Sequence, residues 1–203
     1  MLLCDIGNTS YHFLDESDEY KRSVGVFHPE TIKEKVYYIS VNSSVNSKLA
    51  LLDNWIDLSS FVNRDSYYET MGIDRIVACE AVNNGIIIDA GSAITVDVVR
   101  ESTFEGGFIY PGVNAMQKTY KDISPALDYA FNFSLNPNSL AKNSQDAISY
   151  GYLKLLYSEV LSHKLPIILT GGDADKLQAL FINATINPHL LFNAMHKIIE
   201  KNL

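Results

Sequence analysis

The sequence predicts an α/β protein built from two related halves that face each other across a cleft. An apolar strand, followed at once by an acid, a glycine and a small polar residue, occurs twice, at residues 2–9 and 85–95. Around these two copies, short β-branched runs alternate with segments whose apolar residues recur at helical spacing, as is typical of α/β proteins. Each half therefore offers one small polar loop and one carboxylate, which suits a nucleoside triphosphate and its cation.

The second copy, GIIIDAGSAIT, predicts a strand–turn–strand hairpin. Its isoleucine run predicts a buried strand, because β-branched side chains pack well in a sheet covered on both faces. The strand ends on Asp89, and we expect Gly91 to take a positive φ and bring backbone N–H groups close to a ligand. Ser92 adds a hydroxyl before the next strand resumes at Thr95. The same residues also fit an ordinary tight hairpin with an aspartate in its turn.

The first copy, LLCDIGNT, repeats this arrangement near the start of the chain. Asp5 and Gly7 stand at the spacing of Asp89 and Gly91, and Asn8 falls where the second copy has its serine. A strand resumes after the loop in both copies. We interpret the repetition as a duplicated domain, with a first half at residues 1–82 and a second half at residues 83–203.

The composition of the chain argues against several classes of protein. With 203 residues, 47% hydrophobic and 20% charged, the chain is expected to be globular and able to bury a sizeable core. A net charge of -8 argues against a nucleic-acid partner, which usually requires a basic face. No run is long enough to span a membrane. Cys4 and Cys79 lack metal-ligand spacing, so we expect reduced core cysteines in a cytoplasmic protein.

The remaining elements follow from local patterns. Asn42 and the serines after it suit a helix N-cap or a turn. In the first half we expect a solvated turn at 15–22, a strand at 23–27, a short helix at 29–35, a strand at 36–41 and a helix at 48–55. In the second half we expect a helix at 113–129 broken near Pro125, a helix at 145–161 capped by Ser144, a strand at 166–169, and helices at 175–180 and 190–201.

The segment MGIDRIVACEAV predicts a helix with an acid at its start. Ile76, Val77 and Val82 supply the apolar face of this helix. Asp74 near the first turn is compatible with a simple favourable cap. Because the helix leads directly into the strand that ends on Asp89, Asp74 is also a candidate for the phosphate cleft, and Arg75 beside it can neutralise an anion.

Two glycine-rich segments flank the later strands. Residues 106–112 read GGFIYPG, and residues 170–174 read TGGDA between a strand and a helix. Both let the backbone approach a ligand closely, and both are also compatible with ordinary tight turns. His189 and His196 have no acid at ligand spacing, so we interpret them as structural or surface residues.

Taken in order, these segments resemble type III pantothenate kinase, a family within the superfamily of actin, sugar kinases and heat-shock chaperone ATPases. The resemblance covers nearly the whole chain and is specific through the order and spacing of its motifs. The matching motifs are DIGNT at 5–9, GIDR at 72–75, DAGSAIT at 89–95, GGFIYPG at 106–112, KNS at 142–144 and TGGDA at 170–174.

The resemblance implies two ribonuclease-H-like lobes with an ATP cleft between them, a homodimer, and phosphorylation of pantothenate by ATP with Mg²⁺ as the first step of coenzyme A biosynthesis. It implies that Asp74 is the catalytic base and that Asp89 holds a monovalent cation, K⁺ or NH4⁺. The implied ATP-binding residues are Asp5, Ile6, Gly7, Asn8, Thr9, Ser10, Tyr11, His12 and Ser92. The implied pantothenate-binding residues are Tyr68, Gly72, Ile73, Asp74, Arg75 and Ser144.

The chain departs from the family pattern in three places. Ser92 and Ser144 stand where threonine is usual, which keeps the hydroxyl group. The first lobe is also shorter than expected, which leaves both Tyr67 and Tyr68 as candidates for the pantothenate pocket, with Tyr68 preferred. A phosphohydrolase and a non-catalytic regulatory nucleotide-binding protein of the same fold remain as alternatives. The presence of all three acids, Asp5, Asp74 and Asp89, speaks against a pure binding module.

Overall fold

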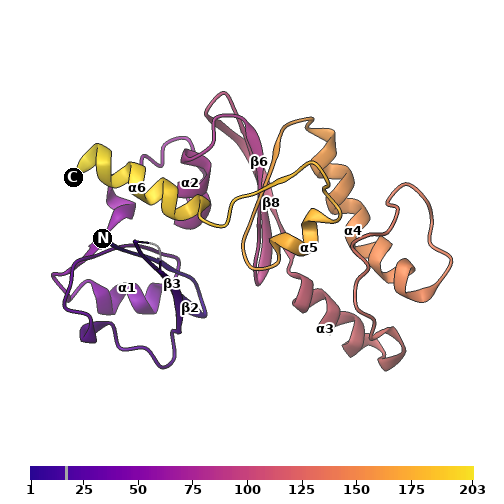
Figure 1. Cartoon of the computed structure of the whole chain (residues 1–203), viewed down its shortest axis with the longest axis horizontal. Helices are drawn as coiled ribbons and strands as arrows, with labels where there is room; N and C mark the ends of the chain where they lie inside the picture. Colours follow the sequence, from indigo (N-terminus) through magenta and orange to yellow (C-terminus); the bar gives the residue numbers. More distant parts are fainter. Residues whose placement is uncertain (17) are drawn as a thin grey trace. The chain divides into compact units, whose positions relative to one another are not determined.

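A computed structural model describes residues 1–16 and 18–203 of the chain (Figure 1). The chain forms two compact units. The first consists of Met1–Ala81 with His189–Leu203, and the second of Val82–Pro188. Each unit contains one five-stranded mixed sheet with flanking helices, which confirms the predicted α/β fold class.

The first unit contains five strands, three α-helices and two 3₁₀ helices among the described residues. They are β1 (Leu2–Ile6), β2 (Ser10–Asp15), β3 (Asp18–Ser23), η1 (Pro29–Thr31), β4 (Val36–Ser40), α1 (Ser43–Leu49), β5 (Trp55–Asp57), η2 (Leu58–Phe61), α2 (Ile73–Glu80) and α6 (Leu190–Asn202).

The second unit contains five strands, three α-helices and one 3₁₀ helix. They are β6 (Gly85–Ala90), β7 (Ala93–Arg100), β8 (Thr103–Pro111), α3 (Val113–Ile123), η3 (Pro125–Leu127), α4 (Ser144–Ser162), β9 (Ile167–Thr170), α5 (Ala174–Gln178) and β10 (Thr185–Ile186).

The two sheets have the same topology, as the duplicated motif predicts. The strand orders are β3-β2-β1-β4-β5 and β10-β9-β6-β7-β8, so β1 and β6 occupy the middle of their sheets. On one side of the middle strand lie two strands joined by antiparallel hairpins, β2 and β3 or β7 and β8. On the other side lie two parallel strands, β4 and β5 or β9 and β10. Each acid-bearing strand is thus the central strand of its unit.

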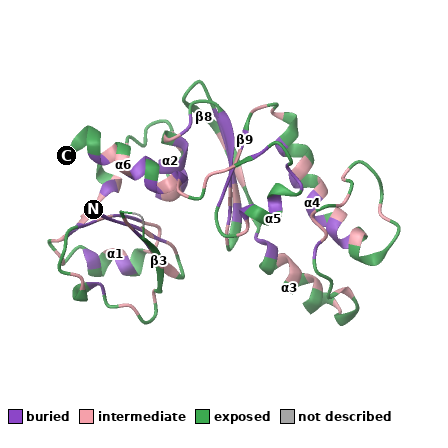
Figure 2. Ribbon diagram, viewed as in Figure 1, coloured by how far each residue is buried: buried purple, intermediate pink, exposed green. Residues whose placement is uncertain are grey.

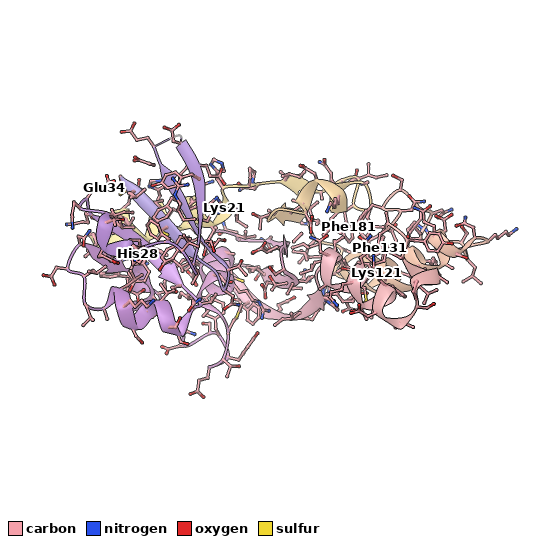
Figure 3. All side chains as sticks on the ribbon, turned by 90° about the horizontal axis from the view of Figure 1, so that it is seen from below. Lys21, His28, Glu34, Lys121, Phe131 and Phe181 are labelled. Atoms are coloured by element: carbon pink, nitrogen blue, oxygen red, sulfur yellow. The ribbon has the colours of Figure 1, made fainter. Side chains whose placement is uncertain are left out.

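Each sheet has a large apolar core on one face, and the opposite face also buries apolar residues, such as Leu3 and Ile87. In the first unit this core contains Leu2, Cys4 and Ile6 from β1, with aromatic side chains such as Tyr11 and Phe13. In the second unit the core face of β6 and β7 packs against α4 and α5, and the Phe131 and Phe181 side chains belong to this core (Figure 3). Both cysteines are buried thiols, as expected for core cysteines.

The C-terminal helix packs with the first unit, whereas the sequence places residues 83–203 together in a second half. α6 contacts β1 and α2, and its buried residues include Leu190, Phe192 and Met195. The chain thus crosses to the second unit after Ala81 and returns at His189. The amphipathic pattern predicts the helix itself, but no local signal indicates which sheet its apolar stripe will cover.

Most of the charged stretch predicted as a turn at 15–22 belongs to an edge strand, β3, so the prediction is wrong for residues 18–22, while Ser17 lies outside the described residues. β3 pairs with β2 from Ser10↔Ser23 to Asp15↔Asp18, but five of its six residues are exposed. Because most of its side chains are charged and exposed, and Tyr20 is the one residue packed on the core, the strand lacks the apolar alternation that identifies strands in a sequence. Charged edge strands also resist pairing with other chains.

Two further boundaries differ from the prediction. The helix expected at 48–55 is α1, which begins after Asn42, whose Oδ1 accepts a hydrogen bond from the N–H of Val45 at 3.2 Å. The N-cap signal therefore located the helix better than its apolar residues did. Residues 106–111 continue one long strand, β8, instead of forming two turns, because their backbone pairs with β7 throughout.

We predict that α4 supplies much of the second unit's packing free energy. Leu153 is fully buried in the core that α4 shares with β6 and β7, whereas Leu155 is 66% exposed. Figure 2 shows that α4 carries both buried and exposed residues. Leu153→Ala should lower the free energy of unfolding by about 2–5 kcal/mol, because it leaves a cavity in the core. The matched control Leu155→Ala should change it by less than about 0.5 kcal/mol. Urea titrations followed by circular dichroism test this, and equal midpoints for the two variants would contradict it.

Candidate active site

The first loop, Gly7 to Thr9, joins β1 and β2 and is fixed by backbone hydrogen bonds. The N–H of Gly7 donates to the carbonyl of Ser10 at 3.0 Å, and the N–H of Val24 donates to the carbonyl of Thr9 at 3.0 Å. The Asn42 side chain donates to the carbonyl of Asn8 at 3.4 Å. The loop is therefore held from the end of β3 and from the start of α1.

Asp5 and His12 lie opposite each other at the base of this loop. They form a directly paired position of the antiparallel β1–β2 hairpin, so their side chains point to the same face of the sheet. That face is the one opposite the core of Cys4 and Ile6. Ile6 and Tyr11 are buried in that core, so only their backbone groups are available to a ligand.

Asp74 lies in the first turn of α2, where its carboxylate folds onto its own helix. Asp74 Oδ1 accepts a hydrogen bond from the N–H of Arg75 at 2.8 Å. Gly72 is the N-cap, and a Cβ at this position would overlap Asp74 Oδ1. Burial raises the pKa of Asp74, while the N–H and the charge of Arg75 lower it, and the net direction is upward. The structure thus places a partly desolvated carboxylate at a helix N-terminus.

Arg75 and Tyr68 form one cluster beside Asp74. Arg75 is buried, and its Nη1 donates to the hydroxyl of Tyr68 at 2.5 Å while its guanidinium carbon lies 5.8 Å from the centre of the Tyr68 ring. The Tyr67 hydroxyl instead donates to Glu80 at the far end of α2 at 2.8 Å. These contacts place Tyr68, and not Tyr67, beside the start of α2. Ile73 is buried and offers only backbone atoms.

The second loop, at Gly91 and Ser92, joins β6 and β7 in the same way. The N–H of Gly91 donates to the carbonyl of Ala93 at 3.0 Å. Gly91 does not have a positive φ, and neither does Gly7, so the prediction of a left-handed glycine in the turn is wrong. The hairpin closes with ordinary backbone angles. Glycine is required instead in the two segments that pack against this loop.

Gly112 and Gly171 are the residues that the second loop requires. A Cβ on Gly112 would overlap the carbonyl of Ser92 and would lie 2.6 Å from that of Gly91. Gly171 has φ +85°, and a Cβ there would overlap Asp89 Oδ1 and lie 2.7 Å from the carbonyl of Ala90. The motifs GGFIYPG and TGGDA therefore converge on the loop that follows Asp89.

Two tyrosines that the sequence analysis did not identify fix the end of GGFIYPG. The Tyr152 hydroxyl from α4 donates to the carbonyl of Pro111 at 2.5 Å, and the Tyr110 hydroxyl donates to the carbonyl of Tyr152. Their rings stack with centroids 5.1 Å apart. This clamp positions Gly112 against the second loop. Tyrosines in apolar surroundings carry no sequence signal that distinguishes such a role from ordinary core packing.

Ser144 is the first residue of α4 but does not cap it. Asn143 is the N-cap, and its Oδ1 accepts a hydrogen bond from the N–H of Asp146 at 2.9 Å. The Asp146 carboxylate in turn accepts from the side chains of Asn143 and Asn132 at 2.7 and 2.8 Å. Asparagine caps a helix as well as serine does, so the prediction of Ser144 as the cap is wrong. Its hydroxyl is exposed at the start of the helix.

Asp97 is a buried acid that the sequence analysis did not identify. It is 1% exposed, and it lies on the same face of the sheet as Asp89, because Asp89 pairs with Thr95 and Ile87 pairs with Asp97. Its position inside an apolar alternating strand hides it from sequence analysis, since a single acid there resembles an outward-facing residue.

Comparison with known proteins assigns the chain to a family. The family model for type III pantothenate kinase matches residues 34–162. A type III pantothenate kinase from Sulfurimonas denitrificans is 58% identical over 201 residues, covering 99% of this chain and 98% of the relative. A second, from Campylobacter jejuni, is 38% identical over 205 residues, covering 100% of this chain and 98% of the relative. The chain belongs to the type III pantothenate kinase family.

Solved structures agree with the fold of a type III pantothenate kinase. A Campylobacter jejuni protein described as a conserved Baf family transcriptional activator has a TM-score of 0.90 at 37% identity, covering 100% of this chain and 98% of that one. A Sinorhizobium meliloti protein described as a 2-dehydro-3-deoxygalactonokinase has a TM-score of 0.60 at 8% identity, covering 99% and 96%. The second likeness shows the fold alone.

We predict that Gly171 is essential for the geometry around Asp89 and that its neighbour is not. Gly171→Ala should lower the free energy of unfolding by about 1–3 kcal/mol, because it combines a positive φ with an overlap on Asp89. The control Gly172→Ala adds a Cβ with no heavy atom within 4 Å and should be nearly neutral. Thermal unfolding of both variants measures the difference. A stable Gly171→Ala protein would contradict the close approach.

Proposed function

We propose that this chain transfers the γ-phosphoryl group of ATP to the primary alcohol of pantothenate, giving 4'-phosphopantothenate for coenzyme A biosynthesis. The observation that supports this most is the cluster at the start of α2. There, a carboxylate with a raised pKa, a buried arginine and a tyrosine lie together on one short stretch of chain. The reaction that we propose is the one for which the relatives are named, and this cluster contains side chains suited to that reaction.

Asp74 is the residue that we assign to the acceptor alcohol. Phosphoryl transfer needs little covalent chemistry from the protein, and positioning of the reacting groups accounts for most of the catalysis. A carboxylate is too weak a base to ionise an alcohol in advance, so Asp74 orients the hydroxyl and takes its proton late in the transfer. The partial burial of Asp74 helps, because it raises the affinity of the carboxylate for that proton.

Arg75 and Tyr68 are assigned to the carboxylate end of pantothenate. A guanidinium pairs well with a carboxylate, and the contacts with Tyr68 already hold its position before substrate binds. We also assign Gly72 and Ile73 to pantothenate through their backbone atoms, and Ser144, an exposed residue, through its hydroxyl.

The phosphates of ATP are assigned to the two hairpin loops. The first contains Asp5, Ile6, Gly7, Asn8, Thr9, Ser10, Tyr11 and His12, and the second contains Ser92. Backbone N–H groups and small hydroxyls of this kind spread phosphate charge without adding bulk. We propose that each of the two ribonuclease-H-like lobes contributes one of these loops to ATP binding.

A monovalent cation at Asp89 fits the oxygen atoms found there. The Asp89 carboxylate and the Ala90 carbonyl both lie next to Gly171, and oxygen ligands of this kind suit hard cations. Within residues 1–16 and 18–203, no group of three or more His, Cys, Asp or Glu can form an all-protein metal site. We therefore assign Mg²⁺ to ATP itself and K⁺ or NH4⁺ to Asp89, where the ion neutralises phosphate charge.

The proposal extends to a homodimer in the cytoplasm. In the described part of the chain, no helix is both long and apolar enough to cross a lipid bilayer. A net charge of -8 disfavours binding to DNA, even though a solved relative is described as a transcriptional activator.

One assay separates this function from its alternatives. ATP labelled on the γ-phosphate is incubated with the protein, Mg²⁺ and K⁺, with and without pantothenate. A kinase transfers label to pantothenate and releases ADP only when pantothenate is present. Pantothenate-independent release of labelled phosphate indicates a phosphohydrolase, and ATP binding without turnover indicates a regulatory protein. Either of the last two results overturns the proposal.

We predict that Asp74→Asn lowers the activity of the protein without lowering its stability. The pKa of Asp74 is higher in the folded protein than in the unfolded chain, so its ionisation costs folding free energy at any pH above the folded-state pKa. The neutral variant should melt at the same temperature as the wild type or higher at neutral pH, while kcat falls by on the order of 10²-fold or more.

The control for this variant is Asp53→Asn, which makes the same change at an exposed site of the same unit. It should leave both kcat and Tm unchanged. Calorimetry and steady-state ADP release measure the two properties. A folded Asp74→Asn enzyme with normal turnover removes Asp74 from the mechanism.

We predict that K⁺ or NH4⁺ supports activity and that Na⁺ substitutes poorly. Na⁺ is smaller and holds its water more tightly, so a site of carboxylate and carbonyl oxygens sized for K⁺ binds it less well. ADP release and the ATP-induced rise in Tm should both be larger in K⁺ than in Na⁺ buffer. Asp89→Asn should abolish this difference, and the exposed control Asp175→Asn should keep it. Equal behaviour of the wild type in both salts argues against the site.

A further inference from the structure

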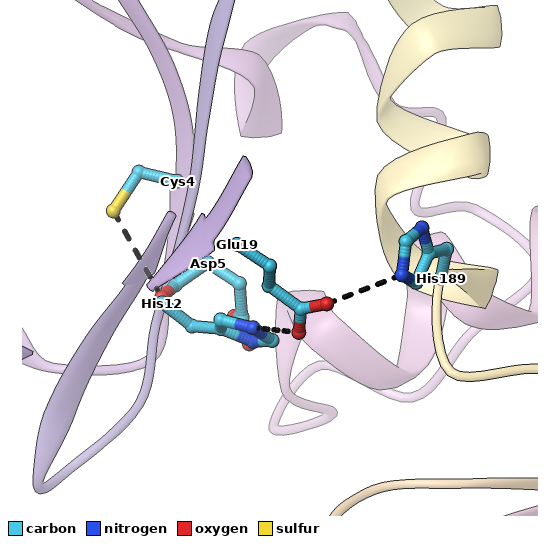
Figure 4. Close-up of polar contacts among 5 residues, drawn as sticks. All are labelled: Cys4, Asp5, His12, Glu19 and His189. Atoms are coloured by element: carbon cyan, nitrogen blue, oxygen red, sulfur yellow. Dashed lines mark hydrogen bonds and ion pairs between the residues drawn. The ribbon is translucent and has the colours of Figure 1, made fainter. Parts of the chain in front are cut away.

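A carboxylate bridge connects the base of the first loop to the C-terminal helix (Figure 4). Glu19 on β3 contacts His12 Nε2 through Oε1, and its Oε2 lies 3.1 Å from the Nε2 of His189. His189 is the N-cap residue of α6. One side chain on an edge strand therefore joins β2 and α6, which lie far apart in sequence.

The bridge fixes the His12 ring in place. In neutral histidine the nitrogen that contacts a carboxylate carries the proton, so Nε2 donates to Glu19 from both His12 and His189. The His12 ring also packs edge-on against Phe192 of α6, with centroids 5.0 Å apart. Burial and then Lys21 lower the pKa of His12, while Glu19 raises it.

The position of His12 connects the bridge to the proposed ATP-binding loop. His12 is directly opposite Asp5 in the β1–β2 hairpin, and both side chains point to the face that α6 covers. Lys21 is opposite His12 on β3 and lies on the same face. Glu19 therefore contacts the residue that lies beside Asp5, at the base of the first loop.

The contribution of the bridge to stability is small. The side chains of Glu19 and His189 are 36% and 42% exposed, and exposed pairs of this kind add little to the free energy of unfolding. α6 is held on the first unit by its buried apolar residues, Leu190, Phe192, Met195 and Ile199. The bridge is thus not needed to attach the helix, and its main effect falls on the hairpin that it contacts.

We propose that Glu19 and His189 are positioning residues of the first phosphate loop, through which the C-terminal helix takes part in ATP binding. The proposal rests on the proposed function, because it takes Asp5 to His12 as an ATP-binding loop. Glu19 holds the His12 ring, and His189 holds Glu19. Neither residue needs to touch ATP.

Glu19→Gln tests the proposal directly. Glutamine keeps the size of the side chain, but its amide can accept from only one imidazole and presents N–H groups to the other. The KM for ATP should rise about three- to tenfold, with kcat and the KM for pantothenate within about twofold of wild type. The ATP concentration for half-maximal thermal stabilisation should rise by the same factor. A general structural defect changes both KM values or lowers Tm without ATP.

His189→Gln at the exposed end of the bridge provides a second variant that leaves the hairpin residues intact. It should raise the KM for ATP in the same direction, and the double variant should be less impaired than the product of the two single effects, since both act on one network. If Glu19→Gln does not fold, the His189→Gln result decides the question. An unchanged KM for ATP in His189→Gln overturns the proposal.

Glu30→Gln is the matched control. It makes the same change in another histidine–glutamate pair of the first unit, in which His28 Nδ1 lies 3.1 Å from Glu30. It should leave both KM values unchanged. If the wild-type protein shows no pantothenate-dependent turnover, the proposed function fails. If the wild type is active but Glu19→Gln affects ATP no more than Glu30→Gln does, only the role of the bridge fails.

Discussion

Both units place a carboxylate at the end of their central strand, and the surroundings of these two acids explain much of the rest of the structure. A carboxylate in this position lies next to apolar side chains. A charge that is neither paired nor hydrogen-bonded there costs folding free energy. Asp5 and Asp89 both avoid the core face of their sheets, and each precedes a short hairpin loop of small polar residues. Each unit has the same arrangement, with a hairpin on one side of the central strand and two parallel strands on the other. Duplication of this arrangement accounts for both loops.

The two units support their loops in different ways. In the second unit, Gly112 and Gly171 approach the loop so closely that no side chain fits, and the Tyr110–Tyr152 clamp holds one of these segments. In the first unit the loop is held by hydrogen bonds from neighbouring elements, including one from the Asn42 side chain to the carbonyl of Asn8. Close backbone packing makes a rigid site, whereas side-chain contacts transmit changes from neighbouring elements. Asp74, the acid at the start of α2, belongs to the first unit.

Local signals predict most of the fold, and long-range packing accounts for what they miss. The repeated motif around Asp5 and Asp89 predicts both hairpins because an apolar strand and its turn are encoded within ten residues. Asp74 is located at its helix start for the same reason. The exposed strand β3 escapes prediction because neither of its faces is apolar, and the docking of α6 on β1 has no local signature. The bridge at Glu19 is missed because its three residues meet only in the folded unit.

The most direct test of the account is a crystal structure with a non-hydrolysable ATP analogue and pantothenate. The account predicts that a carboxylate oxygen of Asp74 lies about 2.6–3.2 Å from the primary hydroxyl of pantothenate, which itself points at the terminal phosphate. In the free protein, Asp74 Oδ1 is engaged by the N–H of Arg75 at 2.8 Å. If pantothenate binds with its hydroxyl against another side chain while Asp74 only caps α2, Asp74 is a structural residue and the central claim is wrong.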